Sequence, residues 1–318
     1  MCVGLLVADV FTSPLQRLPA AGELTTISGL IMSAGGSAAN AAIALRILGR
    51  EVAVAGKVGF DTQGDFVVSE LRRRGIAVTN IRRTPNGGTS GTIVLNVKGE
   101  DRRYLHCTGA NAEFGLGDMD LGSLDGIKVL YFGGYLALPA FSVHALTKLF
   151  REAKLRGLAT VLDVTMPSGA SFGIEHIAGP LRFADYFLPN YEEAARLTGE
   201  RDERLQSKRL NGLNPDCAVV ITRGPEGLIA RQRGRCIEIP AFRMESVDEA
   251  GAGDAFAAGL ITGILENWEL ERALTFAAAI GASRTRALGC FSSVFTFEEA
   301  VSFLENGPSN GGGVGHFQ

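Results

Sequence analysis

A short turn of small residues leads into an acidic residue and an apolar helix near the C-terminal end of the chain. Gly251, Ala252 and Gly253 precede Asp254, and mainly Ala, Gly, Ile and Leu follow. Small residues leave backbone N–H groups accessible, and a helix N-terminus carries partial positive charge, so such a turn can bind a phosphoryl oxygen. A carboxylate there can accept the proton of an attacking hydroxyl, which is general-base catalysis of phosphoryl transfer. The alternative is a plain N-cap aspartate after a glycine turn.

A second glycine turn lies near the N-terminal end of the chain. Gly35 and Gly36 lead into a predicted helix that carries Asn40 in its first turn. The amide of Asn40 can both donate and accept hydrogen bonds, which suits a polyhydroxylated ligand. Asp9 ends the first apolar run, where the alternative to ligand binding is a turn-forming role.

Two weaker motifs lie between these turns. Asn190 and Glu193 stand three residues apart at a predicted helix start, and the alternative is a solvated helix end. Thr222, Gly224 and Gly227 form a TxGxxG pattern, in which glycine lets the backbone approach a ligand closely. Neither motif identifies a function alone.

In this order and spacing, the motifs resemble the two signatures of the ribokinase-like (PfkB) carbohydrate kinases. The first signature is similar to residues 34–42, and the second to residues 247–259. Further similar pieces lie at residues 56–64, 109–111 and 222–227, so that the resemblance extends over nearly the whole chain.

The resemblance implies a catalytic and an acceptor-binding set of residues. Asp254 would be the catalytic base, and the turn of Gly251, Ala252 and Gly253 would form the anion hole for the transferred phosphate. The residues implied in substrate binding are Asp9, Gly35, Gly36, Asn40 and Asn111.

The resemblance also implies ATP as co-substrate and Mg²⁺ as cofactor. Glu193 would hold Mg²⁺ through water, since Mg²⁺ keeps most of its hydration shell. Asp248 is a candidate for a monovalent-cation site, which makes K⁺ a further candidate cofactor. The residues implied in ATP binding are Asn190, Thr222, Gly224, Gly227 and Gly289.

Two departures from the family pattern bear on these expectations. Glu249 stands beside Asp248 where many members carry a small hydroxyl residue, which leaves activation by K⁺ open. Residues 164–167 read Val-Thr-Met-Pro instead of a Pro-Asn-x-Arg continuation, and the missing arginine favours a neutral acceptor.

The rest of the sequence predicts the elements that position these residues. Short β-branched runs alternate with longer helical patterns, as is typical of an α/β fold with a doubly wound, mostly parallel sheet and helices on both faces. The strand-like runs are residues 52–56, 129–133, 160–163, 186–188 and 218–222. The helical patterns are residues 37–48, 62–74, 142–155, 191–197, 254–265 and 270–286.

These elements predict one α/β kinase domain over residues 1–306, with two segments that interrupt the alternation. Residues 11–31 and 87–106 are expected to form a small β lid that closes over the sugar and excludes water. The resemblance implies that such lids pair between subunits, and therefore a homodimer. Residues 307–318 show no periodicity and are expected to be a flexible tail.

Composition excludes several other classes of protein. Of the 318 residues, 46% are hydrophobic and 20% charged, which indicates a folded globular chain. The net charge of −3 argues against nucleic-acid binding, and no run of 18 apolar residues occurs that would span a membrane. Five cysteines without a CxxC pair, and the lack of a basic leader, favour a cytoplasmic location.

We therefore expect ATP-dependent phosphorylation of a hydroxyl on a small sugar. The alternative within the same fold is a nucleoside kinase of the adenosine type. A catalytically silent ligand-binding protein is a less favoured hypothesis, because the residues Gly251, Gly253 and Asp254 are all present. The sequence does not name the sugar or the hydroxyl.

Overall fold

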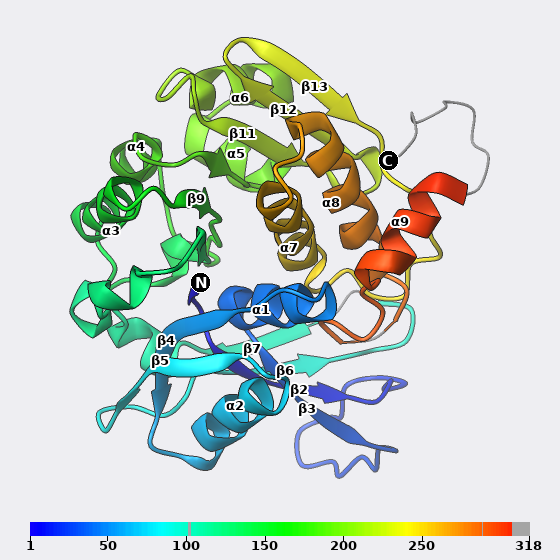
Figure 1. Ribbon diagram of the computed structural model, residues 1–318. Coiled ribbons are helices and arrows are strands. Elements are labelled where there is room, and N and C mark those ends of the chain that lie inside the picture. The colour runs from blue at the N-terminus through cyan, green and yellow to red at the C-terminus, as the bar shows by residue number, and fades with distance from the viewer. Residues whose placement is uncertain (101–102, 288, 307–318) are drawn as a thin grey trace.

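The computed structural model describes residues 1–100, 103–287 and 289–306, which form two sheets and the helices around the larger one (Figure 1). The larger sheet has the order β13-β12-β11-β10-β9-β8-β1-β4-β5. Its strands are β1 (Cys2–Gly4), β4 (Ala53–Gly59), β5 (Ala77–Thr84), β8 (Val129–Gly133), β9 (Ala159–Leu162), β10 (Tyr186–Phe187), β11 (Ala218–Thr222), β12 (Leu228–Gln232) and β13 (Arg235–Ile239). All pair in parallel except β12 and β13, which extend the sheet as antiparallel strands.

Helices cover both faces of the larger sheet, because its buried strands alternate apolar side chains to either side. In β11, Val220 packs into the core on one face, whereas Val219 and Ile221 pack into the core on the other. The first face carries α1 (Ser37–Ile47), α2 (Thr62–Arg73), α7 (Ala252–Leu265), α8 (Leu270–Arg284) and α9 (Phe297–Asn306). The second carries α3 (Val143–Leu155), α4 (Glu175–Leu181), α5 (Tyr191–Thr198) and α6 (Glu203–Asn211). The predicted doubly wound α/β class is confirmed.

Several helices begin where their capping residues predict. Asp61 accepts a hydrogen bond from the N–H of Gly64 at 2.7 Å at the start of α2, and Ser142 caps α3 through Ala145. Helix α7 begins two residues before the expected start at 254, because Gly251 takes a left-handed conformation with φ of 78° as its N-cap. Asp254 therefore lies within the first turn of α7.

The smaller sheet has four strands in the order β3-β2-β6-β7. They are β2 (Val7–Thr12), β3 (Leu30–Gly35), β6 (Gly91–Leu95) and β7 (Arg103–Cys107). The first apolar run thus divides between both sheets, with Leu5 and Leu6 as the link. Asp9 lies inside β2 of the smaller sheet, which corrects its expected position at the end of the first strand of the larger one.

The expected segment boundaries differ from these strands. The smaller sheet takes residues 7–10 and 32–35 in addition to parts of 11–31, because β2 and β3 pair along their full length. The expected segment 87–106 contains β6 and most of β7, which pair as antiparallel strands. The expected tail at 307–318 lies outside the described residues. Among the helices that are described, none is long and apolar enough to cross a membrane.

Candidate active site

The expected site residues gather at the carboxyl edge of the larger sheet, where ligands of open α/β sheets bind. Asn190 follows β10 and Thr222 ends β11, and two residues that were not predicted, Gly134 and Asp163, follow β8 and β9 at the same edge. The N-terminal ends of α1 and α7 reach the same region, because Asn40 of α1 contacts Asp254 of α7. The fold thus brings together residues from both ends of the chain.

The central contact of the site joins Asn40 to Asp254. Asn40 Nδ2 donates a hydrogen bond to Asp254 Oδ2 at 2.9 Å. Asn40 Oδ1 is buried and has no hydrogen-bond partner among the described residues. An unpaired buried acceptor is costly, so this oxygen is placed to accept a hydrogen bond from a ligand hydroxyl beside the carboxylate.

The environment of Asp254 suits a base that works near neutral pH. Burial raises the pKa of Asp254 to about 7, and the negative charge of Asp9 adds to the rise. The hydrogen bond from Asn40 partly opposes it. A carboxylate with a pKa near the working pH combines adequate ionisation with useful proton affinity.

The glycine turn before α7 differs in part from the expected anion hole. Gly251 needs its left-handed backbone, and a Cβ there would lie 2.8 Å from the carbonyl oxygen of Cys290. Gly253 is exposed and has open space around its Cβ position. The N–H of Ala252, however, donates to Glu249 O at 3.2 Å and is used within the turn. A phosphate could therefore accept hydrogen bonds from the amides of Gly251 and Gly253. To bind the amide of Ala252, it would have to displace the hydrogen bond to Glu249.

Asp248 is held by a buried arginine. The side chains of Asp248 and Arg284 are both inaccessible to solvent, and Arg284 Nη2 lies 3.2 Å from Asp248 Oδ2. The N–H groups of Ala250 and Gly289 donate to the two carboxylate oxygens at 2.7 and 2.8 Å. A fixed positive charge thus neutralises Asp248, which removes the electrostatic reason to expect K⁺ at this carboxylate.

The glycine turn before α1, formed by Gly35 and Gly36, depends on the absence of side chains. A Cβ on Gly35 would lie 1.8 Å from Asp9 Oδ2, so that only glycine lets the Asp9 carboxylate lie against this backbone. Gly36 is the N-cap of α1 with φ of 88°. Burial raises the pKa of Asp9 to about 6, and a hydrogen bond with Thr92 partly opposes the rise.

Asn111 has a different role from the expected one. Its side chain is fully buried, donates to Leu6 O at 3.0 Å and accepts from Leu6 N at 3.3 Å. Both polar ends of the amide are therefore used to hold the link between β1 and β2. The expectation of direct substrate contact is corrected to support of the strand that carries Asp9.

Three of the residues predicted to bind ATP or Mg²⁺, Asn190, Thr222 and Glu193, lie next to one another. Asn190 and Thr222 form a parallel β-bridge. Asn190 Oδ1 accepts from Glu193 N at 2.8 Å, and Glu193 Oε2 accepts from Asn190 N at 2.9 Å, so the two residues cap α5 reciprocally. Burial raises the pKa of Glu193 to about 7.

The three expected glycines of this group differ in what they do. A Cβ on Gly227 would lie 2.1 Å from Ile239 O, so the fold itself requires this glycine, whereas Gly224 has open space. Gly289 is bonded to Asp248 and lines a cavity beside the smaller sheet. Its role in ATP binding stays a prediction.

Asp163 is a site residue that the sequence motifs did not identify. Its Oδ2 accepts from Gly134 N at 3.2 Å. Its pKa lies well above the ordinary value because it is buried and faces the negative charges of Glu193 and Asp254. The available signal was its position at the end of the predicted strand 160–163.

These carboxylates suit Mg²⁺ held through water. No group of three His, Cys, Asp or Glu side chains within the described ranges is close enough to bind a metal directly. Mg²⁺ prefers oxygen ligands and is commonly held by one or two carboxylates together with substrate phosphates and water. A hydrated cation near Asp163, Glu193 and Asp254 would relieve their mutual repulsion.

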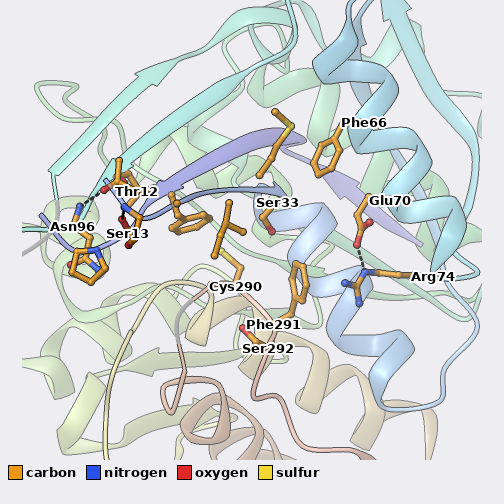
Figure 2. A pocket seen from close by; sticks show the side chains of 18 of the residues that line it. Thr12, Ser13, Ser33, Phe66, Glu70, Arg74, Asn96, Cys290, Phe291 and Ser292 are labelled. Carbon is orange, nitrogen blue, oxygen red and sulfur yellow. Dashed lines mark hydrogen bonds and ion pairs between the residues drawn. The ribbon is translucent and has the colours of Figure 1, made fainter. Parts of the chain in front are cut away.

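A cavity of about 580 Å³ opens beside the smaller sheet. Figure 2 shows Ser33 of β3 and Thr12 of β2 on one side, with Cys290 and Phe291 of the loop after α8 opposite them. Phe66 of α2 and Arg74, the C-cap of that helix, border it on a third side.

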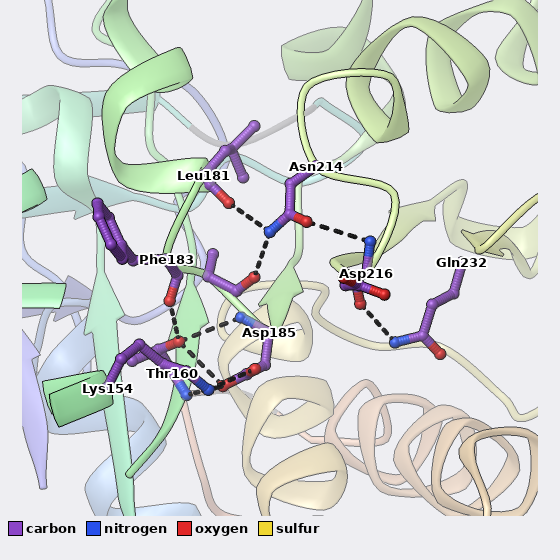
Figure 3. A network of polar contacts seen from close by, with 9 residues as sticks. Lys154, Thr160, Leu181, Phe183, Asp185, Asn214, Asp216 and Gln232 are labelled. Atoms are coloured by element: carbon purple, nitrogen blue, oxygen red, sulfur yellow. Dashed lines mark hydrogen bonds and ion pairs between the residues drawn. The ribbon is translucent and has the colours of Figure 1, made fainter. Parts of the chain in front are cut away.

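The opposite edge of the larger sheet carries structural contacts. Asp185 Oδ1 accepts from Lys154 Nζ at 2.7 Å, and its Oδ2 accepts from Thr160 N at 2.8 Å (Figure 3). Asn214 Nδ2 donates to Leu181 O at 2.9 Å in the same network. These bonds tie together the segments that enter β9, β10 and β11.

Comparison with known proteins agrees with this architecture. Residues 1–296 match the family model described as pfkB family carbohydrate kinase. The chain belongs to this family. The resemblance in the sequence motifs is thereby confirmed.

Individual relatives of this PfkB family member cover most of its length. It is 28% identical over 284 residues to 5-dehydro-2-deoxygluconokinase of Clostridium perfringens, covering 85% of this chain and 83% of that protein. It is 26% identical over 314 residues to ribokinase of Haemophilus influenzae, covering 96% and 97%. Arabidopsis thaliana ribokinase complexed with ribose and ATP superposes with a TM-score of 0.80 at 22% identity, covering 95% and 97%. This last likeness is one of fold.

Proposed function

We propose that this PfkB family member transfers the γ-phosphate of ATP to a hydroxyl of a small sugar, with Asp254 as the general base. The observation that carries the proposal is the position of Asp254. It lies in the first turn of α7 behind a left-handed glycine, bonded to an amide whose other end is unpaired. Such a site joins a base, a hydroxyl-binding group and helix N–H groups for a phosphate.

Proton and phosphate move in opposite directions in the proposed reaction. The acceptor is held by Asp9 and Asn40 so that one hydroxyl faces Asp254. As its oxygen attacks the γ-phosphorus, the O–H proton passes to the Asp254 carboxylate and the bond from phosphorus to the bridging oxygen of ADP breaks. The amides of Gly251 and Gly253 and the N-terminus of α7 stabilise the charge on the transferred phosphoryl group.

ATP is proposed to lie along the turn after β11, near Thr222 and Gly224, with its phosphates directed to α7. Glu193 and Asp163 would hold Mg²⁺ through water, and the ion would neutralise phosphate charge. Asn190 fixes Glu193 through their reciprocal cap. The chain's own contribution here is to orient a carboxylate whose proton affinity burial has raised.

The smaller sheet is proposed to act as the lid. It joins the larger sheet directly through Leu5 and Leu6, between β1 and β2. Closure over the acceptor would exclude water, which otherwise competes for the phosphoryl group.

We also propose a cytoplasmic homodimer that pairs through this sheet. Its face opposite Asp9 carries Met32, Val10, Ile93 and Leu105 in lateral register. Leu105 is 60% exposed, and Met32 and Ile93 are each more than 40% exposed. Light scattering should report twice the 33.6 kDa chain mass, and Ile93→Lys should shift the protein toward the monomer. A wild-type monomer at assay concentration would contradict the dimer.

The proposed activity is tested by ADP release from Mg·ATP across hexoses, pentoses, sugar acids, sugar phosphates and nucleosides. Asp254→Asn serves as the catalytic variant. Asp65→Asn is the matched control, because Asp65 also lies in the first turn of a helix but is exposed on α2. Acceptor-dependent release that Asp254→Asn abolishes and Asp65→Asn retains supports the proposal. Equal release by both variants would refute Asp254 as the base.

A further inference from the structure

The face of the smaller sheet that carries Asp9 presents a row of polar side chains. Ser33 pairs with Asp9, Asp9 with Thr92, and Thr92 with His106 across the four strands. Directly opposed residues of neighbouring strands project to the same face. Thr92 Oγ1 lies 3.0 Å from His106 Nδ1, and Thr92 also hydrogen-bonds to Asp9. We call these four residues the polar row.

The next row on the same face is apolar. Two residues further along each strand, Ile31 pairs with Phe11, Phe11 with Val94, and Val94 with Tyr104. Of these, Ile31, Phe11 and Val94 line the cavity of about 580 Å³. We call Ile31, Phe11 and Val94 the apolar row. It offers no hydrogen-bond partner for a sugar hydroxyl.

The cavity borders the strand beside Asp9 and the turn before α7. Ser33 belongs both to the polar row and to the cavity lining. Cys290 lines the cavity, and its carbonyl oxygen lies 2.8 Å from the Cβ position of Gly251 in the turn before α7. A ring attached to an acceptor at Asp9 and Asp254 would therefore lie next to this cavity.

Several polar groups around the apolar row are already hydrogen-bonded within the protein. Thr12 Oγ1 accepts from Asn96 N at 3.1 Å, and Ser13 Oγ accepts from Ser28 N at 3.2 Å. Arg74 is bonded to Glu70 at 2.7 Å (Figure 2). These groups already have hydrogen-bond partners within the protein when no ligand is bound.

The ring of Phe291 is held facing this cavity. The guanidinium of Arg74 lies 4.4 Å from the Phe291 ring centroid, which fixes the ring from the α2 side. Figure 2 shows Phe291 directed into the cavity from the loop after α8. The cavity thus has aromatic surface on both walls, from Phe11 and from Phe291.

We propose that the acceptor of this kinase is a sugar that carries a flat apolar ring, such as a nucleoside or an aryl glycoside. The sugar hydroxyls would bind the polar row together with Asn40 and Asp254. The ring would pack against the apolar row and Phe291, where aromatic contact and water exclusion favour it. This inference rests on the proposed kinase function and narrows its substrate class.

The test measures kcat/KM by ADP release with acceptors matched for the sugar. D-ribose is compared with purine and pyrimidine ribonucleosides, and D-glucose with phenyl glucosides. We expect the ring-bearing member of at least one pair to be better by about tenfold or more. Comparison of the ribonucleosides with the phenyl glucosides then shows whether a nucleobase or a phenyl ring is preferred. Equal or better turnover of the bare sugars overturns the inference while leaving the kinase proposal intact. Absence of ADP release with every acceptor refutes the kinase proposal itself.

Variants make the assignment specific to the cavity. Phe11→Leu removes the flat ring but keeps apolar volume, and Ile31→Thr alters a largely exposed position and so spares the core. Each is expected to lower the ratio of ring-bearing to bare-sugar kcat/KM. Phe60→Leu is the control, since Phe60 is an exposed phenylalanine outside the cavity lining and should leave the ratio unchanged. An unchanged ratio in both cavity variants would count against the inference.

Discussion

Asn40 Nδ2 lies 2.9 Å from Asp254 Oδ2, although 214 residues separate the two in the sequence. The first turns of α1 and α7 meet here, so that one amide both holds the carboxylate and presents a free oxygen beside it. The hydrogen bond from Asn40 favours the ionised carboxylate of Asp254, which the proposed role as a base requires, against the burial that favours the protonated form. Replacing Asn40 should therefore alter both proton affinity and acceptor binding.

For Asn40→Ala, we expect the KM for the acceptor to rise, and the pH profile of kcat/KM to move to higher pH. The hydrogen bond that lowers the pKa of Asp254 is lost, and so is the partner for a ligand hydroxyl. Kinetics from pH 5 to 9 on wild type and variant provide the measurement. A profile that stays at the same pH would show that Asn40 does not influence the base.

In the wild-type enzyme, kcat/KM should increase with pH and level off above about 7. The base must be ionised, and the pKa of Asp254 in the free protein is about 7. Below this value activity should fall about tenfold per pH unit as the carboxylate takes up its proton. The control is an acceptor-independent ATP-binding assay over the same range. Activity that is already maximal at pH 5 would contradict the assignment.

The same pKa rise has a consequence for folding. The unfolded chain loses the Asp254 proton near its ordinary value of 3.8 and the folded chain near 7, so the folded state binds more protons between them. Stability contributed by this group is therefore highest at low pH, declines as pH rises to 7, and stays reduced above it. Asp254→Asn should raise the melting temperature relative to wild type at pH 8 more than at pH 5. If Asp254→Asn melted at a lower temperature than wild type at pH 8, the expected direction of the stability change would be contradicted.

Removing the positive charge from Arg284 should destabilise the fold severely. Arg284→Met leaves Asp248 buried without its ion pair, and breaking one side of such a pair costs about 3–5 kcal/mol. Urea unfolding measures the loss, and the double variant Arg284→Met with Asp248→Asn should recover part of it. Additive losses in the double variant would mean that the two charges are not coupled.

Because Arg284 supplies a fixed positive charge at Asp248, turnover should not depend on the monovalent cation. Replacing K⁺ by Na⁺ or tetramethylammonium at constant ionic strength should leave the rate within assay error. Selective activation by K⁺ would place a cation elsewhere near the turn before α7.

Gly35→Ala should weaken acceptor binding with little change in ATP binding. Its Cβ would lie 1.8 Å from Asp9 Oδ2 and displace that carboxylate. Separate KM values for acceptor and ATP distinguish the two effects. Gly117→Ala is the control, since its Cβ position has open space and its φ is not positive. Equal changes in both KM values would indicate a general loss of structure.

Local signals predicted much of this site. The glycine turns, Asn40, Asp254 and the capping pair of Asn190 and Glu193 each depend on a few neighbouring residues. The α/β alternation likewise follows from short-range hydrophobic pattern. These features therefore lie where the sequence places them.

The features that the sequence did not predict depend on distant contacts. Nothing near Asn111 indicates that its amide binds Leu6, 105 residues away. Arg284 appears as one more basic residue at a helix end until the fold buries it against Asp248. Asp9 lies in the smaller sheet because the first strand ends before Leu5 and Leu6, and a new strand begins after them. The polar row could not be predicted, because it depends on the register of four strands.

The distance in sequence between Asn40 and Asp254 also governs when the enzyme can become active during its synthesis. A nascent chain that has completed β11 already holds Gly35, Gly36 and Thr222 but lacks the turn before α7 and the proposed base. Such a chain could not carry out the proposed transfer. The onset of that activity would therefore report the packing of α7 against α1.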